Sequence, residues 1–168
     1  MHIEKQKILQ ELFPILFSKS NTVNPWNPHK CFEPIEGFGI ECGDGWFDII
    51  AECAGKIEEY NNSLKPKNIL HILWIKFADR FLSKIFWKYQ IPFFPSAPVR
   101  AVQIKEKYGL LNIYLDNYIE VADDATDKAY QKSETICEVC GKPGKMREDR
   151  GWYFTACNYH FKNRNKYV

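Results

Sequence analysis

The sequence lacks any long apolar run and any strong excess of one charge. Of its 168 residues, 23 are Lys or Arg and 21 are Asp or Glu, so the formal net charge is +2. No stretch reaches the roughly 18 uncharged apolar residues that a transmembrane helix needs, and the N-terminal residues do not form a secretory signal. We therefore expect no transmembrane segment, a cytoplasmic protein and reduced cysteines. The near-neutral balance argues against a surface that coats nucleic acid as a whole.

Motifs of the common enzyme classes are also missing. The sequence has no P-loop, no dinucleotide-binding glycine fingerprint, no nucleophile elbow and no zinc-protease helix motif. Asp44 with Asp48, and the charged run 105–107, could supply acid–base groups. The first pattern is better explained by a helix cap with Trp46 as a buried aromatic residue, and the second by a solvated hairpin end. The sequence leaves enzymatic activity open and favours a non-enzymatic protein.

What is present is a pattern of helices around a short hairpin. A 3.6-residue apolar periodicity predicts helices over residues 4–18, 44–63 and 117–134. We expect Asp44 to cap the second helix, and Asp116 or Asn117 to cap the third. The third helix should bury one edge and expose an acidic face. The buried positions expected in these last two helices are Trp46, Ile49, Ile50, Cys53, Ile57 and Tyr60, and then Ile119, Ala122, Ala125 or Thr126, Ala129 and Tyr130.

Alternating apolar residues over 102–115 predict an antiparallel hairpin, because side chains alternate between the two faces of a strand. Residues 107–109 supply its turn, in which Gly109 can take a positive φ. Residues 19–43 are rich in turn-forming residues and read as a long irregular connection. The fold class predicted for the body is therefore α+β, with helices packed on a small antiparallel sheet.

Near the end of the chain, Cys137, Cys140, Cys157 and His160 follow the pattern C-x2-C-x16-C-x2-H. Three thiolates and one imidazole suit the tetrahedral coordination of Zn²⁺. Because four protein ligands leave no open position, the single zinc ion should be structural. The spacing predicts a C-terminal zinc ribbon, so we divide the chain into an α+β body at 1–134 and a ribbon at 135–168.

The other cysteines do not predict a second ion. Cys31, Cys42 and Cys53 lie near His29 in the sequence, but none of them forms a C-x2-C pair. Cys53 also falls on the expected buried face of its helix, where a free cysteine behaves as a small hydrophobic residue.

Residues 64–97 form a basic, aromatic-rich helical insertion. Between Lys65 and Lys88 there are six cations and one anion, and cations recur every fourth residue. If this segment packs inside the domain, its aromatics are core. If it projects, it would bind a protein partner, bind another copy of the chain or lie on a membrane surface, and its narrow polar stripe favours protein contact over the membrane. The candidate partner-binding residues are Trp74, Lys76, Phe77, Arg80, Phe81, Lys84 and Trp87.

The ribbon offers a second candidate interface, for nucleic acid. Residues 132–168 carry eight cations and four anions among several aromatics. The opposing interpretation is that these aromatics cover the small zinc core. The candidate nucleic-acid contacts are Lys142, Lys145, Arg147, Arg150 and Trp152.

Three blocks of the sequence together resemble one group of proteins. They are the ECGDGWFD block at 41–48, the QIKEKYG hairpin at 103–109, and the CxxCGxPG…CxxH pattern at 137–160. This combination is similar to uncharacterised small proteins of bacteriophages and prophages. The resemblance, over residues 35–63 and 98–160, implies a protein that acts in the cytoplasm of a bacterial host cell. It implies binding to a host or phage macromolecule, for example as an inhibitor of a bacterial defence system.

Overall fold

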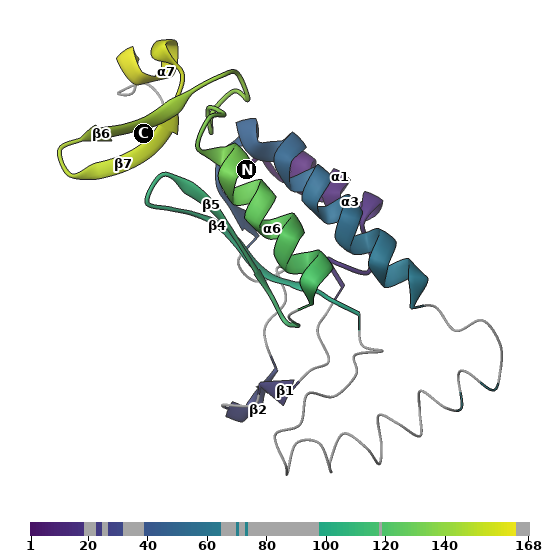
Figure 1. The fold of residues 1–168 in the computed structure, drawn as a ribbon. Helices are drawn as coiled ribbons and strands as arrows, with labels where there is room; N and C mark the ends of the chain where they lie inside the picture. The colour runs from purple at the N-terminus through teal and green to yellow at the C-terminus, as the bar shows by residue number, and fades with distance from the viewer. Residues whose placement is uncertain are drawn as a thin grey trace.

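The computed structural model describes residues 1–18, 39–64, 70, 73, 98–117 and 119–163, together with the backbone of 23–24 and 27–31. The body consists of helices packed on a small sheet, so the α+β class is confirmed (Figure 1). Its helices are α1 (Ile3–Leu12), the 3-10 turn η1 (Asp44–Trp46) with α3 (Phe47–Ser63), and α6 (Glu120–Ser133). Its sheet contains β3 (Ile40–Glu41), β4 (Ala101–Lys107) and β5 (Leu110–Leu115) in that order, and a separate ladder joins β1 (Val23–Asn24) to β2 (Asn27–Cys31).

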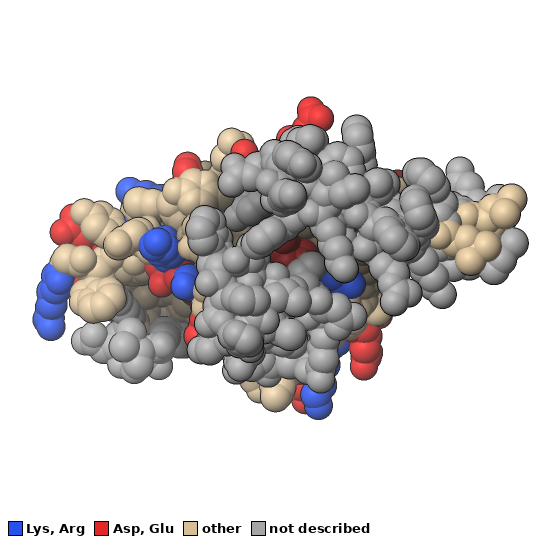
Figure 2. Space-filling model, turned by 90° about the horizontal axis from the view of Figure 1, so that it is seen from below, with Lys and Arg blue, Asp and Glu red and all other residues tan. Residues whose placement is uncertain are grey.

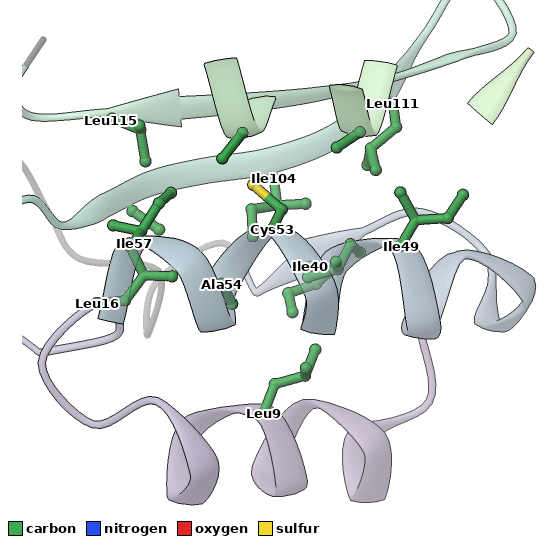
Figure 3. Close-up of a cluster of buried hydrophobic side chains, with 14 of the residues drawn as sticks. Leu9, Leu16, Ile40, Ile49, Cys53, Ala54, Ile57, Ile104, Leu111 and Leu115 are labelled. Atoms are coloured by element: carbon green, nitrogen blue, oxygen red, sulfur yellow. The ribbon is translucent and has the colours of Figure 1, made fainter. Parts of the chain in front are cut away.

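The core forms around α3. Figure 3 shows this helix between α1, which contributes Leu9, and strands β4 and β5, which contribute Ile104 and Leu111. Trp46 and Ile57 are fully buried, as the periodicity predicts. Removing such large apolar side chains from water is the main favourable term in folding.

Helix α6 packs beside α3 through a row of small residues (Figure 1). Ala122, Ala125 and Ala129 are buried, and their short side chains let the two helix backbones approach each other. The predicted burial of Tyr130 is wrong, because this side chain is 39% exposed. It lies next to Ala129 at the edge of the buried row, where a ring can turn outward to solvent.

The predicted hairpin is confirmed. Strands β4 and β5 pair antiparallel from Ala101↔Leu115 to Lys107↔Leu110. The two turn residues, Tyr108 and Gly109, both have positive φ, at 55° and 80°. This backbone suits the right-handed twist of a two-residue hairpin.

Strand β3 was not predicted. It lies in the segment 19–43 that the sequence analysis treats as irregular, and it pairs parallel to β4 through Ile40↔Ile104 and Glu41↔Lys105. Two residues are too few to show an alternating pattern, so their strand character comes only from the distant partner.

The predicted helix caps are wrong. The carboxylate of Asp44 accepts a hydrogen bond from the backbone N–H of His2 (2.6 Å), at the start of α1, and lies 3.7 Å from the Lys5 ammonium. Asp116 instead accepts from the backbone N–H of Arg100 (2.7 Å) and pairs with the Arg100 guanidinium. Helix α6 begins at Glu120, with no side-chain cap.

The first helix is also shorter than predicted. It ends at Leu12, whereas the periodicity suggested residue 18. Pro14 disfavours a helical conformation at the residue before it and has no N–H to donate. Leu16 and Phe17, which follow this break, are still buried. The apolar pattern therefore predicts correctly which residues are buried, but it overestimates the length of the helix.

Asn61, at the end of α3, holds the chain that enters β4. Its side-chain amide donates to the Val99 carbonyl (2.9 Å), and its carbonyl oxygen accepts from the Val99 N–H (2.8 Å). Both residues are buried. Because Asn61→Leu would leave two buried backbone groups without partners, we expect it to lower the free energy of unfolding by roughly 2–4 kcal/mol. Urea denaturation measures this loss, and Asn62→Leu, the same change at an exposed neighbour, should have a much smaller effect.

The basic insertion at 64–97 lies almost wholly outside the described residues. Within it, Leu70 and Leu73 are described and exposed. The candidate partner-binding residues between 74 and 87 are not described. None of the helices in the described ranges is both long enough and apolar enough to cross a membrane.

The charged side chains of the described residues are mixed in sign. Seen from below, Lys and Arg side chains lie among Asp and Glu side chains (Figure 2). The described residues with side chains contain 13 Lys or Arg and 18 Asp or Glu, a net charge of −5, so the cationic excess that brings the whole chain to +2 belongs to residues whose side chains the structure does not describe.

Candidate metal centre

The C-terminal segment folds as an antiparallel hairpin followed by a short helix. Strand β6 (Lys145–Asp149) pairs antiparallel with β7 (Trp152–Ala156), and α7 (Asn158–Lys162) follows. The turn between the strands contains Arg150 and Gly151, both at positive φ. The register brings Lys145 opposite Ala156, so the loop before β6 and the chain leaving β7 meet at one end of the hairpin.

The four predicted ligands meet at this end of the hairpin. Cys137 and Cys140 lie in the loop before β6, Cys157 directly follows β7, and His160 lies in α7. Their ligand atoms all lie within 4.8 Å of one another. The four side chains can therefore bind one metal ion, as the spacing predicts.

The local backbone explains how the loop presents two sulfurs to one point. The N–H of Gly141 donates to the Cys137 carbonyl (2.9 Å), and the N–H of Cys137 donates to the Lys142 carbonyl (2.8 Å). Gly141 has φ +72°, a left-handed conformation that residues with a side chain rarely adopt. The resulting tight turn places Cys137 and Cys140 on the same side.

Three of the distances between ligand atoms in the cluster are shorter than 4 Å. The Cys157 sulfur lies 3.3 Å, and the Cys137 sulfur 3.5 Å, from the Nδ1 atom of His160. The sulfurs of Cys140 and Cys157 are 3.9 Å apart. These separations are those between neighbouring vertices of a small tetrahedron, with Nδ1 as the histidine ligand atom.

The electrostatics of the cluster favour a thiolate at Cys157. A backbone N–H of His160 donates to this sulfur and lowers the pKa of the thiol to about 6. Burial acts in the opposite direction at Cys140, where it raises the thiol pKa. Since a metal binds the deprotonated sulfur, metal binding at this site must release protons.

The other described cysteines are not part of a metal site. Within the described residues, the group containing Cys137 is the one that has metal-binding geometry. Cys42 and Cys53 are free and buried, and burial raises the pKa of each thiol to about 12. The side chains of His29 and Cys31 lie outside the described residues.

The difference between the thiol pKa of Cys157, about 6, and that of the buried Cys53, about 12, predicts the order in which the cysteines react. A thiol with a pKa of about 12 is almost entirely protonated at pH 8, and the thiolate is the reactive form. After a chelator is added at pH 8, Cys140 and Cys157 should react with iodoacetamide, while Cys53 reacts only once urea unfolds the body. Peptide mass spectrometry measures the order of labelling. Labelling of Cys53 before Cys157 would contradict the assignment.

The loop 43–46 of the body packs directly against the metal-binding loop. The N–H of Gly43 donates to the Glu138 carboxylate (2.8 Å), and the N–H of Gly45 donates to the Glu138 carbonyl (2.6 Å). The indole N–H of Trp46 donates to the Ile136 carbonyl (2.8 Å). A Cβ on Gly45 would lie 2.2 Å from the Cys137 carbonyl oxygen. Only glycine permits this approach of the two loops.

The β4–β5 turn supports the ribbon from a second side. The buried hydroxyl of Thr155 donates to the Gly109 carbonyl (2.7 Å). A Cβ on Gly109 would lie 2.9 Å from the backbone nitrogen of Phe154. In Figure 1 the tip of this hairpin lies against β6 and β7, on the side away from α7.

Most of the candidate catalytic groups have structural partners. The Asp44 carboxylate holds the start of α1, and Asp48 is exposed in the first turn of α3. Lys105 lies over the Tyr114 ring at 5.4 Å. Glu106 accepts a hydrogen bond from the Gly109 N–H in the turn.

The candidate nucleic-acid contacts are mostly exposed. Lys142, Lys145, Arg150 and Trp152 face solvent. Arg147 is half-buried, with its guanidinium 4.7 Å from the centre of the Phe161 ring. The interpretation that the ribbon aromatics cover the zinc core fails for Trp152, which is 72% exposed. It fails in the same way for Tyr153 and Tyr159.

No protein-family model, curated protein or solved structure matches the chain.

Proposed function

We propose that this chain is a non-enzymatic binding protein whose C-terminal ribbon is held together by one structural zinc ion. The observation that carries the proposal is the convergence of Cys137, Cys140, Cys157 and His160. Four protein ligands complete the tetrahedral shell of zinc and leave no position for a substrate or a reactive water.

Three of the distances are compatible with a zinc tetrahedron, within a cluster whose ligand atoms all lie within 4.8 Å of one another. Zinc–sulfur bonds of about 2.3 Å and zinc–nitrogen bonds of about 2.0–2.1 Å put tetrahedral vertices about 3.8 Å apart for two sulfurs and about 3.6 Å apart for a sulfur and a nitrogen. The corresponding separations here are 3.9 Å between sulfurs, and 3.3 and 3.5 Å between sulfur and Nδ1. A thiolate-rich ligand set also disfavours magnesium and calcium, which prefer oxygen.

The proposed setting is the cytoplasm of a bacterial host cell, with the protein encoded by a phage or prophage. Support for this part comes from the three sequence blocks at 41–48, 103–109 and 137–160. The partner would be a host or phage macromolecule, and inhibition of a host defence system is the role that fits such an origin. A protein partner would bind through the basic, aromatic insertion, whose apolar contacts are screened little by salt.

An affinity pull-down from infected-host lysate tests the protein-partner proposal. We expect one specific protein to be retained at high salt by the unaltered chain and lost with Phe81→Asp. Retention of that protein by Phe81→Asp would exclude the insertion as the interface. No specific retention by either chain would contradict a stable protein partner.

Nucleic-acid binding through the ribbon is the second candidate function. It is supported by the exposure of Trp152 together with Lys142, Lys145 and Arg150. Binding of this kind releases counterions and weakens steeply as salt rises. A gel-shift series over salt concentration distinguishes it from protein binding, since absence of a shift at low salt removes this candidate.

A further inference from the structure

We propose that one face of the ribbon hairpin is a stacking surface for single-stranded nucleic acid, with Trp152 as its principal base contact. We define this outer face by Lys145, Arg147, Trp152 and Phe154, together with Phe161 of α7. The inference rests on the proposed function of the chain as a binding protein and names the class of its partner.

The strand register places these residues together. Asp149 pairs with Trp152, Arg147 with Phe154, and Lys145 with Ala156. Because alternate residues of a strand point to the same side, Trp152 and Phe154 share a face with Arg147 and Lys145. The outer face therefore carries two aromatic rings and two cations within one short hairpin, with the anion Asp149 on the same face at the turn end.

Contacts within the outer face hold its inner part rigid. The rings of Phe154 and Phe161 are stacked with centroids 6.1 Å apart and an angle of 27°. The Arg147 guanidinium lies over Phe161 and donates to the Asn158 side chain (2.5 Å). Trp152, two residues from Phe154, extends this aromatic row to the exposed end of the hairpin.

The opposite face of the hairpin is used for packing. Thr155 is buried and donates to Gly109, which places the body against that side. In Figure 1, α7 lies on the other side of the hairpin from the β4–β5 tip. The outer face is therefore turned away from the body, with Lys145 and Trp152 exposed and with Arg147 and Phe154 half-buried against Phe161 of α7.

The charge of this region fits a polyanion. Described residues 135–163 contain five cations (Lys142, Lys145, Arg147, Arg150 and Lys162) and three anions (Glu138, Glu148 and Asp149), a formal net charge of +2. Three thiolates around one Zn²⁺ ion lower this charge to +1. Glu148 and Asp149 lie at the turn end of β6, and Asp149 is opposite Trp152. Phosphates are therefore expected nearer Lys145 and Lys162, with a base on Trp152. Cations combined with exposed flat rings are the features that bind unpaired nucleotides.

The structure favours single strands over a duplex. In a duplex the bases stack on one another, so their faces are not available to an aromatic side chain. The major groove admits an α-helix or a two-stranded β-ribbon, so only binding measured with a duplex probe excludes insertion of the β6–β7 hairpin into a duplex. The adjacent helix α7 has five residues, and the exposed side of α6 is acidic, with Glu120, Asp123, Asp124 and Asp127. That acidic side would repel the phosphates of a duplex lying along the body.

Fluorescence anisotropy with the full zinc-loaded chain tests the inference. The probes are labelled oligo(dT), oligo(rU) and a DNA duplex. We expect both single strands to bind more tightly than the duplex, with affinity falling as salt rises. Because stacking on one aromatic is worth about 1–3 kcal/mol per base, Trp152→Ala should weaken single-strand binding about tenfold or more. Tyr130→Ala, which removes an exposed aromatic of α6, should bind like the unaltered chain.

A second variant tests the charge contribution without changing the aromatic row. Lys145→Ala should reduce the slope of log affinity against log salt by about 0.7, the contribution of one phosphate contact to a single strand. Each variant is compared with the unaltered chain for zinc content and circular dichroism. If Trp152→Ala loses zinc, its weaker binding could result from unfolding of the ribbon. In that case the salt slope of Lys145→Ala alone tests whether single-stranded nucleic acid contacts the outer face.

Three results would overturn the inference: no binding of either single strand at low salt, duplex binding as tight as single-strand binding, or unchanged binding and salt slope in both variants. A protein partner whose capture resists salt and is lost with Trp152→Ala would also overturn it, by giving the outer face another occupant. In a chain that contains zinc, these results leave the proposed binding function standing. Absence of zinc would instead contradict the proposed function itself.

Discussion

Removing the metal ion is expected to disorder residues 135–163 while the body stays folded. Among the described ribbon residues, the fully or nearly fully buried ones are Cys137, Thr155 and Ala156, which is too little apolar surface to stabilise a hairpin and a short helix. In small zinc modules the bound ion contributes roughly 10–16 kcal/mol, and without it the module unfolds. The body keeps its own core around α3.

Amide hydrogen exchange before and after addition of a chelator measures this difference. Protection should be lost in β6, β7 and α7 and largely retained in α3 and β4. Cys137→Ser should reproduce the effect of the chelator, because it removes one ligand. Cys53→Ala serves as the matched control, since it removes a buried sulfur that is no ligand, and it should keep both the ion and the ribbon's protection. Full protection of the ribbon in the presence of chelator would exclude a structural role for the ion.

Gly45→Ala is expected to be strongly destabilising. The added Cβ would lie 2.2 Å from the Cys137 carbonyl oxygen, 2.3 Å from the Gly141 nitrogen and 2.6 Å from the Cys140 nitrogen. All three atoms belong to the backbone of the metal-binding loop, so no side-chain rotation can relieve the contact. Either the loop moves away from the body or the body distorts, and we expect a loss of about 3 kcal/mol or more in the free energy of unfolding.

Gly55→Ala is the control, and its expected effect on the free energy of unfolding has the opposite sign. Gly55 lies within α3, and a Cβ there would meet only the Phe13 ring at 3.7 Å, an ordinary contact. Alanine loses less backbone entropy on forming a helix, so this change should stabilise the protein by about 0.5–1 kcal/mol. Urea denaturation of the two variants compares them directly. Equal stability of Gly45→Ala and the unaltered chain would show that the two loops do not approach each other as described.

The features that the sequence predicted correctly are those specified by neighbouring residues. The β4–β5 hairpin follows from alternation around a turn at Tyr108 and Gly109. The metal-binding cluster follows from two short ligand pairs, because each pair is held by one tight turn. The buried face of α3 follows from the helical period, and Trp46 and Ile57 are buried where that period places them.

The features that the sequence analysis missed depend on distant partners. Asp44 has the composition of an N-cap, but its carboxylate binds the start of α1, 42 positions away in the chain. Asp116 likewise does not cap a helix, because its carboxylate binds Arg100, the residue that precedes β4. Strand β3 exists only because Ile40 and Glu41 lie beside β4. No local pattern distinguishes these arrangements from their alternatives.

One missed feature did leave a signal in the sequence. Gly43 and Gly45 flank Asp44, in a stretch that the sequence predicts to be a turn followed by the start of a helix. Two glycines so close together also permit another backbone to approach, and here that backbone is the loop at 137–141. The partner of that approach could not be predicted, since it lies about 90 residues further along the chain.

X-ray absorption at the zinc edge of the purified chain, together with its elemental composition, examines the metal centre most directly. We expect one zinc ion per chain, surrounded by three sulfurs at about 2.3 Å and one imidazole nitrogen at about 2.0–2.1 Å. A chain purified without any bound zinc, or a zinc shell made mainly of oxygen atoms, would contradict the account.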